Sequence, residues 1–245
     1  MSLKVVDLGV ARGGVPVLEG VNFAVAPREA VVLTGPNGAG KTTLISQLSG
    51  ALKPDSGSIT FKGANITNRP AHTRARLGIT RSFQITSLVM EMSVLDNVAL
   101  AVQAREGHSF RFLKPARSIA PIRQTALEML DQVGLAGRAN DATAALSHGE
   151  HRQMEIAIAL ATGAQLMLLD EPMAGLGPEE STTMVGFLKG LKGKRTILLI
   201  EHDMDAVFAL ADRISVLVYG HVIATGSPDD IRNNDAVRHA YLGEE

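Results

Sequence analysis

The chain has 245 residues, 45% of them hydrophobic, so it can bury a sizeable core as one large domain or as one domain that carries a subdomain. It has no cysteine, which excludes disulfides and thiolate metal sites, and no apolar run approaches the roughly 18 residues that cross a membrane. The net charge of -1 hides a basic first half and an acidic second half, and the N-terminus lacks the features of a signal peptide, so a cytosolic location is expected.

The first part of the chain is rich in short runs typical of β-strands. Turn signals such as KPDSG at 53–57 separate several of these runs, and helical patterns separate others. This alternation indicates an α/β fold. Strands are expected at 3–8, 21–25, 30–35, 57–61 and 78–83.

A phosphate-binding loop follows the third of these strands. The segment AVVLTGPNGAGKTT matches G-x-x-x-x-G-K-[ST] at Gly35, Gly40, Lys41 and Thr42, and a helical pattern follows it. The glycines let the backbone curl round an anion, and the helix N-terminus adds the positive end of its dipole. Lys41 adds a charge for the terminal phosphates of a nucleotide, and the Thr42 hydroxyl offers a ligand for Mg²⁺. The backbone N–H groups expected to face the phosphates belong to Asn37, Gly38, Ala39, Gly40, Lys41, Thr42 and Thr43.

The middle of the chain changes character. Helical patterns at 93–104, 123–133 and 150–161 replace the strand runs, and a long loop is expected at 105–121. This predicts a helical subdomain of residues 85–163, inserted into a sheet domain formed by residues 1–84 and 164–245.

The stretch LSHGEHRQ stands at the head of the third helical pattern. Ser147 and Glu150 have the spacing of a capping box, and the buried stripe of the helix is expected at Met154, Ala157, Ile158 and Ala161. A zinc site at His148 and His151 is the alternative, but no third ligand stands near them in the sequence.

Two strands buried on both faces are expected next, at 166–170 and 196–201, because their apolar runs show no alternation, and another strand is expected at 214–219. Asp170 ends the first strand and is suited to the Mg²⁺ shell, and the adjacent Glu171 is suited to polarise an attacking water. His202 follows the second strand and could donate a hydrogen bond to a γ-phosphate. A strand-terminating turn and a structural histidine are the respective alternatives.

The phosphate loop, RSFQ, LSHGE, LMLLDEP and LLIEHD, in this order, resemble the motifs of the ATP-binding cassette (ABC) superfamily over essentially the whole chain. The resemblance implies an α/β P-loop NTPase with a mixed central sheet, an antiparallel β portion and an inserted helical subdomain. It implies that ATP and Mg²⁺ are bound, with Gln84 joining Thr42 and Asp170 at the metal and with Glu171 and His202 supporting hydrolysis. It also implies that the signature residues act in trans, on ATP held by a second cassette subunit, identical or paralogous. The signature residues are Ser147, His148, Gly149 and Glu150.

Several stretches look more specifically like the ATP-binding subunit of branched-chain amino acid importers, among them GITRSFQ, LSHGEHRQMEIA, AGLGPEE and the tail from Ile231. That resemblance implies a peripheral subunit on the cytoplasmic face of the membrane. ATP-driven closure of the dimer of such subunits would power integral permease subunits. A solute-binding protein would be an indirect partner. Related ATPases for urea, short amides or lipopolysaccharide are the alternatives. A nucleic-acid-associated ABC ATPase is disfavoured because the insert has neither sustained heptads nor a zinc module, so no nucleic-acid partner is expected.

The sequence departs from the family pattern at three places. Arg12 stands where the family usually has an aromatic residue that stacks on adenine, and its guanidinium plane is expected to take over this stacking. Gly177 replaces a frequent aspartate, and His148 and Glu150 replace the usual glycine and glutamine of the signature. Among the residues after Gln84, Leu88 and Met90 are expected either to receive a helix of the membrane subunit or to join the core.

Overall fold

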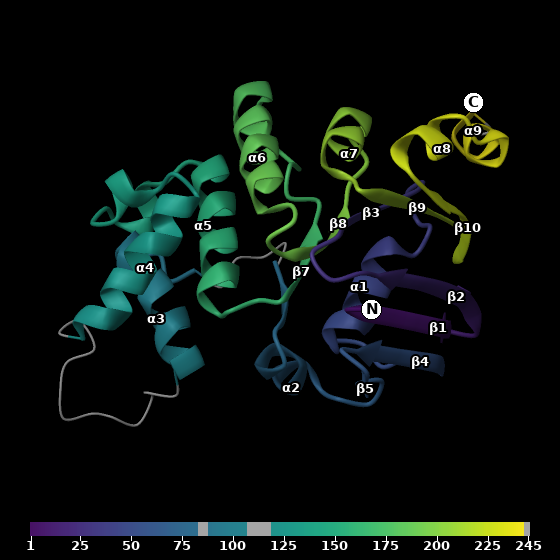
Figure 1. Ribbon diagram of the computed structural model, residues 1–245, viewed down its shortest axis with the longest axis horizontal. Coiled ribbons are helices and arrows are strands. Elements are labelled where there is room, and N and C mark those ends of the chain that lie inside the picture. Colours follow the sequence, from purple (N-terminus) through teal and green to yellow (C-terminus); the bar gives the residue numbers. More distant parts are fainter. Residues whose placement is uncertain (83–87, 107–118, 243–245) are drawn as a thin grey trace.

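The computed structural model describes residues 1–82, 88–106 and 119–242, and Gln84 therefore lies outside the described residues. Figure 1 shows two sheets on one side of the molecule and a group of helices on the other. The larger sheet has six strands and carries the runs that the sequence predicts to be buried. Its strands, in spatial order, are β10 (His221–Gly226), β9 (Arg213–Val218), β3 (Ala30–Thr34), β8 (Thr196–Ile200), β7 (Leu166–Asp170) and β6 (Ile79–Arg81).

The six-stranded sheet is mixed. β9, β3, β8, β7 and β6 run parallel, and β10 pairs antiparallel with β9. β10 was not expected from the sequence, because it is an edge strand in which no residue is fully buried and the apolar signal is correspondingly weak.

The second sheet is antiparallel. Its strands, in spatial order, are β2 (Val15–Val25), β1 (Leu3–Arg12), β4 (Ser56–Phe61) and the short β5 (Ala64–Asn65). The helix α1 (Lys41–Ser49) lies between the two sheets, because its Leu44 and Leu48 share one core cluster with Leu33 of β3 and Ile59 of β4. The expected antiparallel portion is thus packed against the phosphate-loop helix.

The other face of the large sheet is covered by helices. Alternate residues of β3 separate the two faces, since Val31 and Leu33 face α1 whereas Ala30 and Val32 belong to the second core cluster. This alternation explains why the central strands read as continuous apolar runs. The covering helices are α6 (Pro178–Leu191), α7 (Met204–Leu210), α8 (Pro228–Arg232) and α9 (Asp235–Leu242).

Three further helices pack together at one end of the molecule: α3 (Val94–Glu106), α4 (Ala120–Gln132) and α5 (His148–Ala161). They stand where the sequence predicts a helical subdomain, with 3₁₀ turns at Ala136–Arg138 and Thr143–Ala145 between α4 and α5 and a short helix α2 (Ala71–Arg76) before β6. The subdomain boundaries at 84/85 and 163/164 stay a prediction. Of the expected long loop, residues 107–118 lie outside the described residues.

The buried face of α5 is wider than the predicted stripe. Met154, Ala157 and Ala161 are buried as expected and Ile158 is half-buried, but Ile156, Ala159 and Leu160 are buried too. The reason is that α5 packs against α3 and α4 on one side and against α6 on the other. In the parts of the chain that the structure describes, no helix is both long and apolar enough to cross a membrane.

Candidate functional site

The phosphate loop is held by two close approaches that only glycine permits. A Cβ on Gly35, whose φ is +146°, would lie 1.9 Å from the carbonyl oxygen of Leu217 in β9. A Cβ on Gly40, with φ +102°, would lie 2.9 Å from the carbonyl oxygen of Val17 in β2. The motif glycines are therefore required by the packing of the loop between the two sheets as well as by its curvature.

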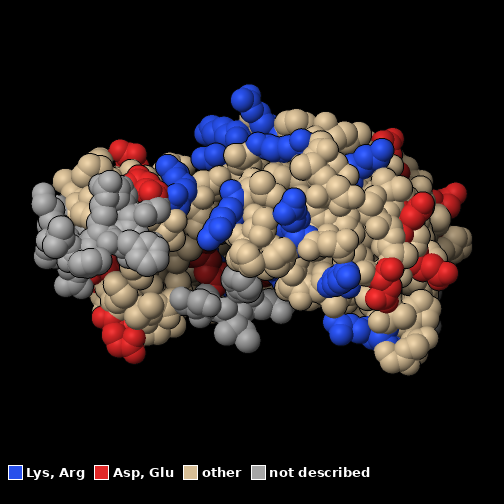
Figure 2. Space-filling view, turned by 90° about the horizontal axis from the view of Figure 1, so that it is seen from below, with Lys and Arg blue, Asp and Glu red and all other residues tan. Residues whose placement is uncertain are grey.

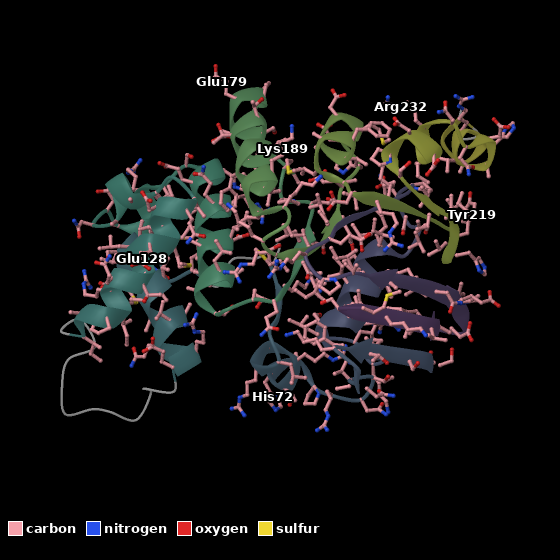
Figure 3. All side chains as sticks on the ribbon, viewed as in Figure 1. His72, Glu128, Glu179, Lys189, Tyr219 and Arg232 are labelled. Carbon is pink, nitrogen blue, oxygen red and sulfur yellow. The ribbon has the colours of Figure 1, made fainter. Side chains whose placement is uncertain are left out.

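The turn between β9 and β10 is tied to the same loop. Gly220 N–H donates to the carbonyl of Ala39 at 3.1 Å, and Glu19 N–H donates to the carbonyl of Gly220 at 3.1 Å. Tyr219, next to this glycine, is 84% exposed (Figure 3). The loop is thus anchored by two segments that are distant from it in sequence, β2 and the end of β9 with the turn that follows it.

Lys41 begins α1 and is largely buried. Its Nζ donates to the carbonyl oxygens of Gly35 and Pro36 at 2.6 and 2.8 Å. Burial lowers the pKa of Lys41, and the carboxylates of Glu171 and Asp170 partly oppose this effect. No side chain of the described residues caps the N-terminus of α1, so the first-turn N–H groups remain suited to an anion. Of the other predicted loop residues, Asn37, Gly38 and Thr42 are exposed, Ala39 is buried and Thr43 is half-buried.

Asp170 lies at the carboxyl end of β7 with a fully buried side chain. Its Oδ2 accepts from Arg81 Nη2 at 2.8 Å, whereas its Oδ1 is buried and has no hydrogen-bond partner among the described residues. A buried carboxylate oxygen without a donor suits a hard cation such as Mg²⁺, so this residue fits the predicted metal. Thr42 is an exposed residue of α1, and its backbone carbonyl is linked to Asp170 through Ser46 and Arg81.

Glu171 and His202 come together at the carboxyl ends of neighbouring strands. His202 Nδ1 is 3.8 Å from Glu171 Oε1, and the side chains are 63% and 27% exposed. Glu171 has a φ of +49°, a left-handed conformation that non-glycine residues rarely adopt, and its N–H donates to the carbonyl of Ile200 at 3.1 Å. A strained backbone beside an exposed imidazole is typical of functional sites.

The residues on either side of His202 have structural contacts. Glu201 is buried and accepts from the N–H groups of Met173 and His202 at 3.1 and 3.2 Å. Burial raises the pKa of Glu201, and these two hydrogen bonds partly oppose the rise. Asp203 caps α7 by accepting from the N–H groups of Asp205 and Ala206.

The predicted capping box of the signature forms at the start of α5. Ser147 Oγ accepts from Glu150 N–H at 3.2 Å, and Ser147 N–H donates to Glu150 Oε2 at 2.8 Å. Glu150 also pairs with Arg138 at 2.8 Å. The His151 ring nitrogen lies 2.9 Å from the Thr143 carbonyl, a contact that accounts for this histidine without a metal.

The signature also contacts the start of α6. Ser147 Oγ lies 3.3 Å from Glu180 Oε1, and a Cβ on Gly149 would lie 2.6 Å from the same oxygen. A Cβ on Gly175 would lie 3.3 Å from His148 Nε2. Gly177 N–H donates to Glu180 Oε2 at 3.2 Å, so one carboxylate joins the heads of both helices.

Sequence reasoning overlooked Arg81 and Glu180. Arg81 is a charged residue inside an expected strand. A charge is costly to bury in a sheet, and this could have identified Arg81 as a residue with a specific role. Glu180 stands three residues after Gly177 and accepts from its N–H, but Gly177 has no side chain to return a bond, so the sequence shows no capping-box pattern there. Arg12 is exposed at the end of β1, and its stacking role stays a prediction. Leu88 packs against the core cluster of the helices, which is the second of its two predicted environments.

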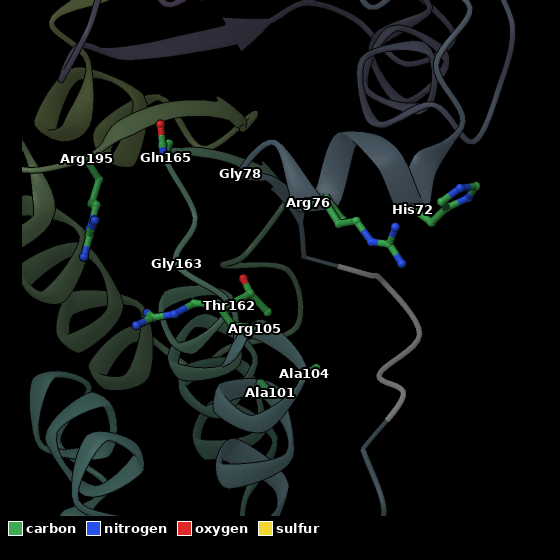
Figure 4. A pocket seen from close by; sticks show the side chains of 11 residues that line it. His72, Arg76, Gly78, Ala101, Ala104, Arg105, Thr162, Gly163, Gln165 and Arg195 are labelled. Atoms are coloured by element: carbon green, nitrogen blue, oxygen red, sulfur yellow. The ribbon is translucent and has the colours of Figure 1, made fainter. Parts of the chain in front are cut away.

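A separate cleft of about 910 Å³ lies at the opposite end of β6 and β7 (Figure 4). Gly78 and Gln165 precede these strands and line it, together with residues of α2 and α3. No acidic residue is among its lining residues, and the face shown in Figure 2 carries many lysine and arginine side chains. The basic residues that line the cleft are His72, Arg76, Arg105 and Arg195.

Comparison with known proteins gives concordant results. Residues 18–174 match the family model described as ABC transporter, and residues 221–245 match one described as branched-chain amino acid ATP-binding cassette transporter. The chain is 39% identical to the high-affinity branched-chain amino acid transport ATP-binding protein LivG of Salmonella typhimurium, covering 99% of this chain and 98% of that protein.

Solved structures agree in fold. The ADP conformation of an ATP-binding cassette of an ABC transporter superposes with a TM-score of 0.86 at 29% identity, covering 99% of this chain and 98% of the other. A dimeric post-hydrolysis state of another cassette, bound to ADP and Pi, gives a TM-score of 0.76 at 25% identity, with 92% and 98% covered.

Proposed function

Because the chain belongs to the ABC transporter family of ATP-binding cassettes, we propose that it is the ATP-hydrolysing subunit of an importer of branched-chain amino acids. Nucleotide binding and ATPase activity follow from the family. The substrate class is supported by the transport function of relatives such as LivG and by the match of the C-terminal segment. The observation that carries the proposal is geometric: β3, β8 and β7 are adjacent, so the phosphate loop, His202 and Asp170 with Glu171 follow the carboxyl ends of neighbouring strands.

Each side chain has a distinct task in this proposal. Lys41 and the loop N–H groups bind the β- and γ-phosphates, and Glu171 takes a proton from the attacking water. His202 donates to the γ-phosphate and keeps Glu171 oriented. Thr42, Asp170 and Gln84 would hold Mg²⁺, which would neutralise charge at the phosphates when bound.

A second cassette completes the site. Ser147 and Gly149 stand at a helix N-terminus, which favours an anion, and Ser147 is exposed there although Gly149 is buried. The proposal is that this N-terminus contacts the γ-phosphate on the partner subunit, so that ATP closes the dimer and hydrolysis opens it. The affinity difference between the ATP and ADP states then drives a permease at the cytoplasmic face of the membrane.

The basic cleft offers a place for the permease to dock. It lies between α2 and α3, and β6 leads from it toward the segment that contains Gln84. Its lining of arginines without acidic residues fits an acidic cytoplasmic segment of the membrane subunit.

The test is purification of the intact complex from native membranes through a tag on this chain. Copurification of permease subunits, and ATPase activity in liposomes that rises with leucine, isoleucine or valine and a solute-binding protein, would support the proposal. Stimulation by urea, short amides or lipopolysaccharide instead would correct the substrate. DNA-stimulated ATPase activity without any membrane partner would overturn the transport role.

A further inference from the structure

We infer that Arg81 is a positioning residue that fixes the carboxylate of Asp170, so that Oδ1 and not Oδ2 is offered to the metal of the nucleotide. The inference rests on the proposed function, in which Asp170 serves Mg²⁺. It assigns a role to a side chain three positions before Gln84, the first residue of the RSFQ motif, to which the family resemblance gave no role.

The two oxygens of Asp170 have different surroundings. Oδ2 receives Arg81 Nη2 at 2.8 Å, and the two side chains are 0% and 13% exposed, respectively. Oδ1 is buried and has no hydrogen-bond partner among the described residues. A carboxylate with one oxygen held and the other free is oriented for a single further ligand.

Arg81 is itself anchored on the helix that carries the phosphate loop. Its Nη1 donates to Ser46 Oγ at 3.0 Å, and Ser46 Oγ donates to the carbonyl of Thr42 at 2.7 Å. One guanidinium therefore spans β6, β7 and α1, with Nη2 on Asp170 and Nη1 on the helix turn that begins with Thr42. The planar fork of arginine can make both contacts at a fixed angle, whereas a lysine ammonium cannot.

Stability alone is a weak explanation of this ion pair. Burying two charges costs free energy that their attraction repays only when the remaining polar atoms are satisfied. Here Arg81 Nε and Asp170 Oδ1 are both buried without a hydrogen-bond partner in the described structure. The arrangement leaves unsatisfied the one oxygen that a metal would use, which points to a site held in a defined geometry.

The test measures how much Mg²⁺ strengthens ATP binding. ATP affinity is determined by competition with a fluorescent nucleotide, once in EDTA and once in Mg²⁺, for wild type, Arg81→Gln and Arg81→Lys. We expect Arg81→Gln to reduce the Mg²⁺-dependent gain in affinity by about tenfold, as for other residues that orient a metal ligand. Binding in EDTA is expected to stay within about twofold of wild type, because the loop and Lys41 are unchanged. Arg81→Lys is expected to recover part of the gain.

Arg123→Gln is the matched control. Arg123 pairs with Asp96 at the same 2.8 Å, and the Asp96 side chain is 8% exposed. Asp96 lies in α3 and Arg123 in α4, away from the phosphate loop. This variant is expected to keep the full Mg²⁺-dependent gain. An equal loss in both variants would show a general effect of breaking a part-buried ion pair and would overturn the inference.

Other results of the same measurement would also decide whether Arg81 positions Asp170. An unchanged gain in a folded Arg81→Gln protein overturns the positioning role, and an increased gain shows that Arg81 only competes with the ion for Asp170. If Arg81→Gln fails to fold by circular dichroism, Ser46→Ala decides, since it removes the anchor on α1 and keeps the ion pair. Ser46→Ala is expected to lower the gain by about twofold to threefold, and an unchanged gain refutes the inference. A wild-type chain that binds no ATP in either condition contradicts the proposed function instead.

Discussion

Glu171, whose carboxylate lies 3.8 Å from His202, has a left-handed backbone conformation. This conformation costs a residue with a Cβ roughly 1–2 kcal/mol, and glycine avoids the cost at the expense of a more flexible unfolded chain. Glu171→Gly is therefore expected to unfold with a free energy about 1 kcal/mol higher than Glu171→Gln, which keeps the strain. Urea denaturation of the two variants measures the difference, and equal stabilities would show that the φ of +49° stores no strain.

Both substitutions at Glu171 remove the proposed base. We expect ATP hydrolysis to fall by about 10²–10⁴-fold in Glu171→Gln, while ATP affinity is retained because Lys41 and the loop are intact. Single-turnover kinetics and equilibrium binding separate the two effects. Turnover at the wild-type rate in Glu171→Gln would remove Glu171 from the role of base.

Glu201, which directly follows β8, makes the stability of the folded protein depend on pH. Burial raises the pKa of its carboxyl above the ordinary 4.5, so the folded chain binds this proton more tightly than the unfolded chain. Its contribution to the free energy of unfolding is then fully present below about pH 4.5 and is lost as the pH rises through the raised pKa. Relative to Glu201→Gln, wild type should gain stability as the pH falls through the raised pKa toward 4.5, by at most about 1.4 kcal/mol per pH unit.

Urea titrations at several pH values test this dependence, with Glu128→Gln as control. Glu128 is exposed on α4 (Figure 3), and its substitution is expected to leave the pH profile of wild type in place. Parallel profiles for wild type and Glu201→Gln would contradict the assignment.

At the scale of elements, the head of α5 has two tasks that substitutions can separate. Ser147→Ala removes the cap and is expected to cost about 1 kcal/mol of stability. Ser147→Asn and Ser147→Asp both preserve a capping oxygen, but the aspartate adds a negative charge beside Glu180 and at the proposed phosphate contact. We expect Ser147→Asn to stay close to wild type in stability and in ATP-driven association, and Ser147→Asp to lose association. Thermal denaturation and sedimentation with ATP compare them, and normal association of Ser147→Asp would place the phosphate contact elsewhere.

At the scale of the whole molecule, the proposed dimer predicts complementation between two inactive variants. Lys41→Ala lacks a working phosphate loop and Ser147→Asp lacks a working signature. In a mixed dimer of the two, one of the two sites combines an intact loop with an intact signature. Neither variant is expected to associate with itself, so the dimers that form on mixing are mixed dimers, and the mixture is expected to reach at most about half of wild-type ATPase activity. No recovery on mixing would mean that loop and signature act within one chain, or that the natural partner is a different cassette.

The complete fold shows which features could be predicted from the sequence alone. Local signals sufficed for the phosphate loop, the buried strands and the capping box at Ser147, because each depends on neighbours in the chain. The Arg81–Asp170 pair and the contact of Glu180 with Ser147 join residues 89 and 33 positions apart. Such contacts depend on which strands and helices become neighbours, and no local pattern encodes them. The edge strand β10 was missed for the related reason that pairing with β9, not burial, defines it.

The turn at Tyr219 and Gly220 also offers a position for a fluorescent reporter of the phosphate loop. The chain contains no tryptophan and only two tyrosines, so a tryptophan introduced at Tyr219 would be its sole indole emitter. Tyr219 is 84% exposed, and its neighbour Gly220 is hydrogen-bonded to Ala39 of the loop. The emission of a Tyr219→Trp protein can therefore report nucleotide arrival and departure in real time, without a label attached to the ATP.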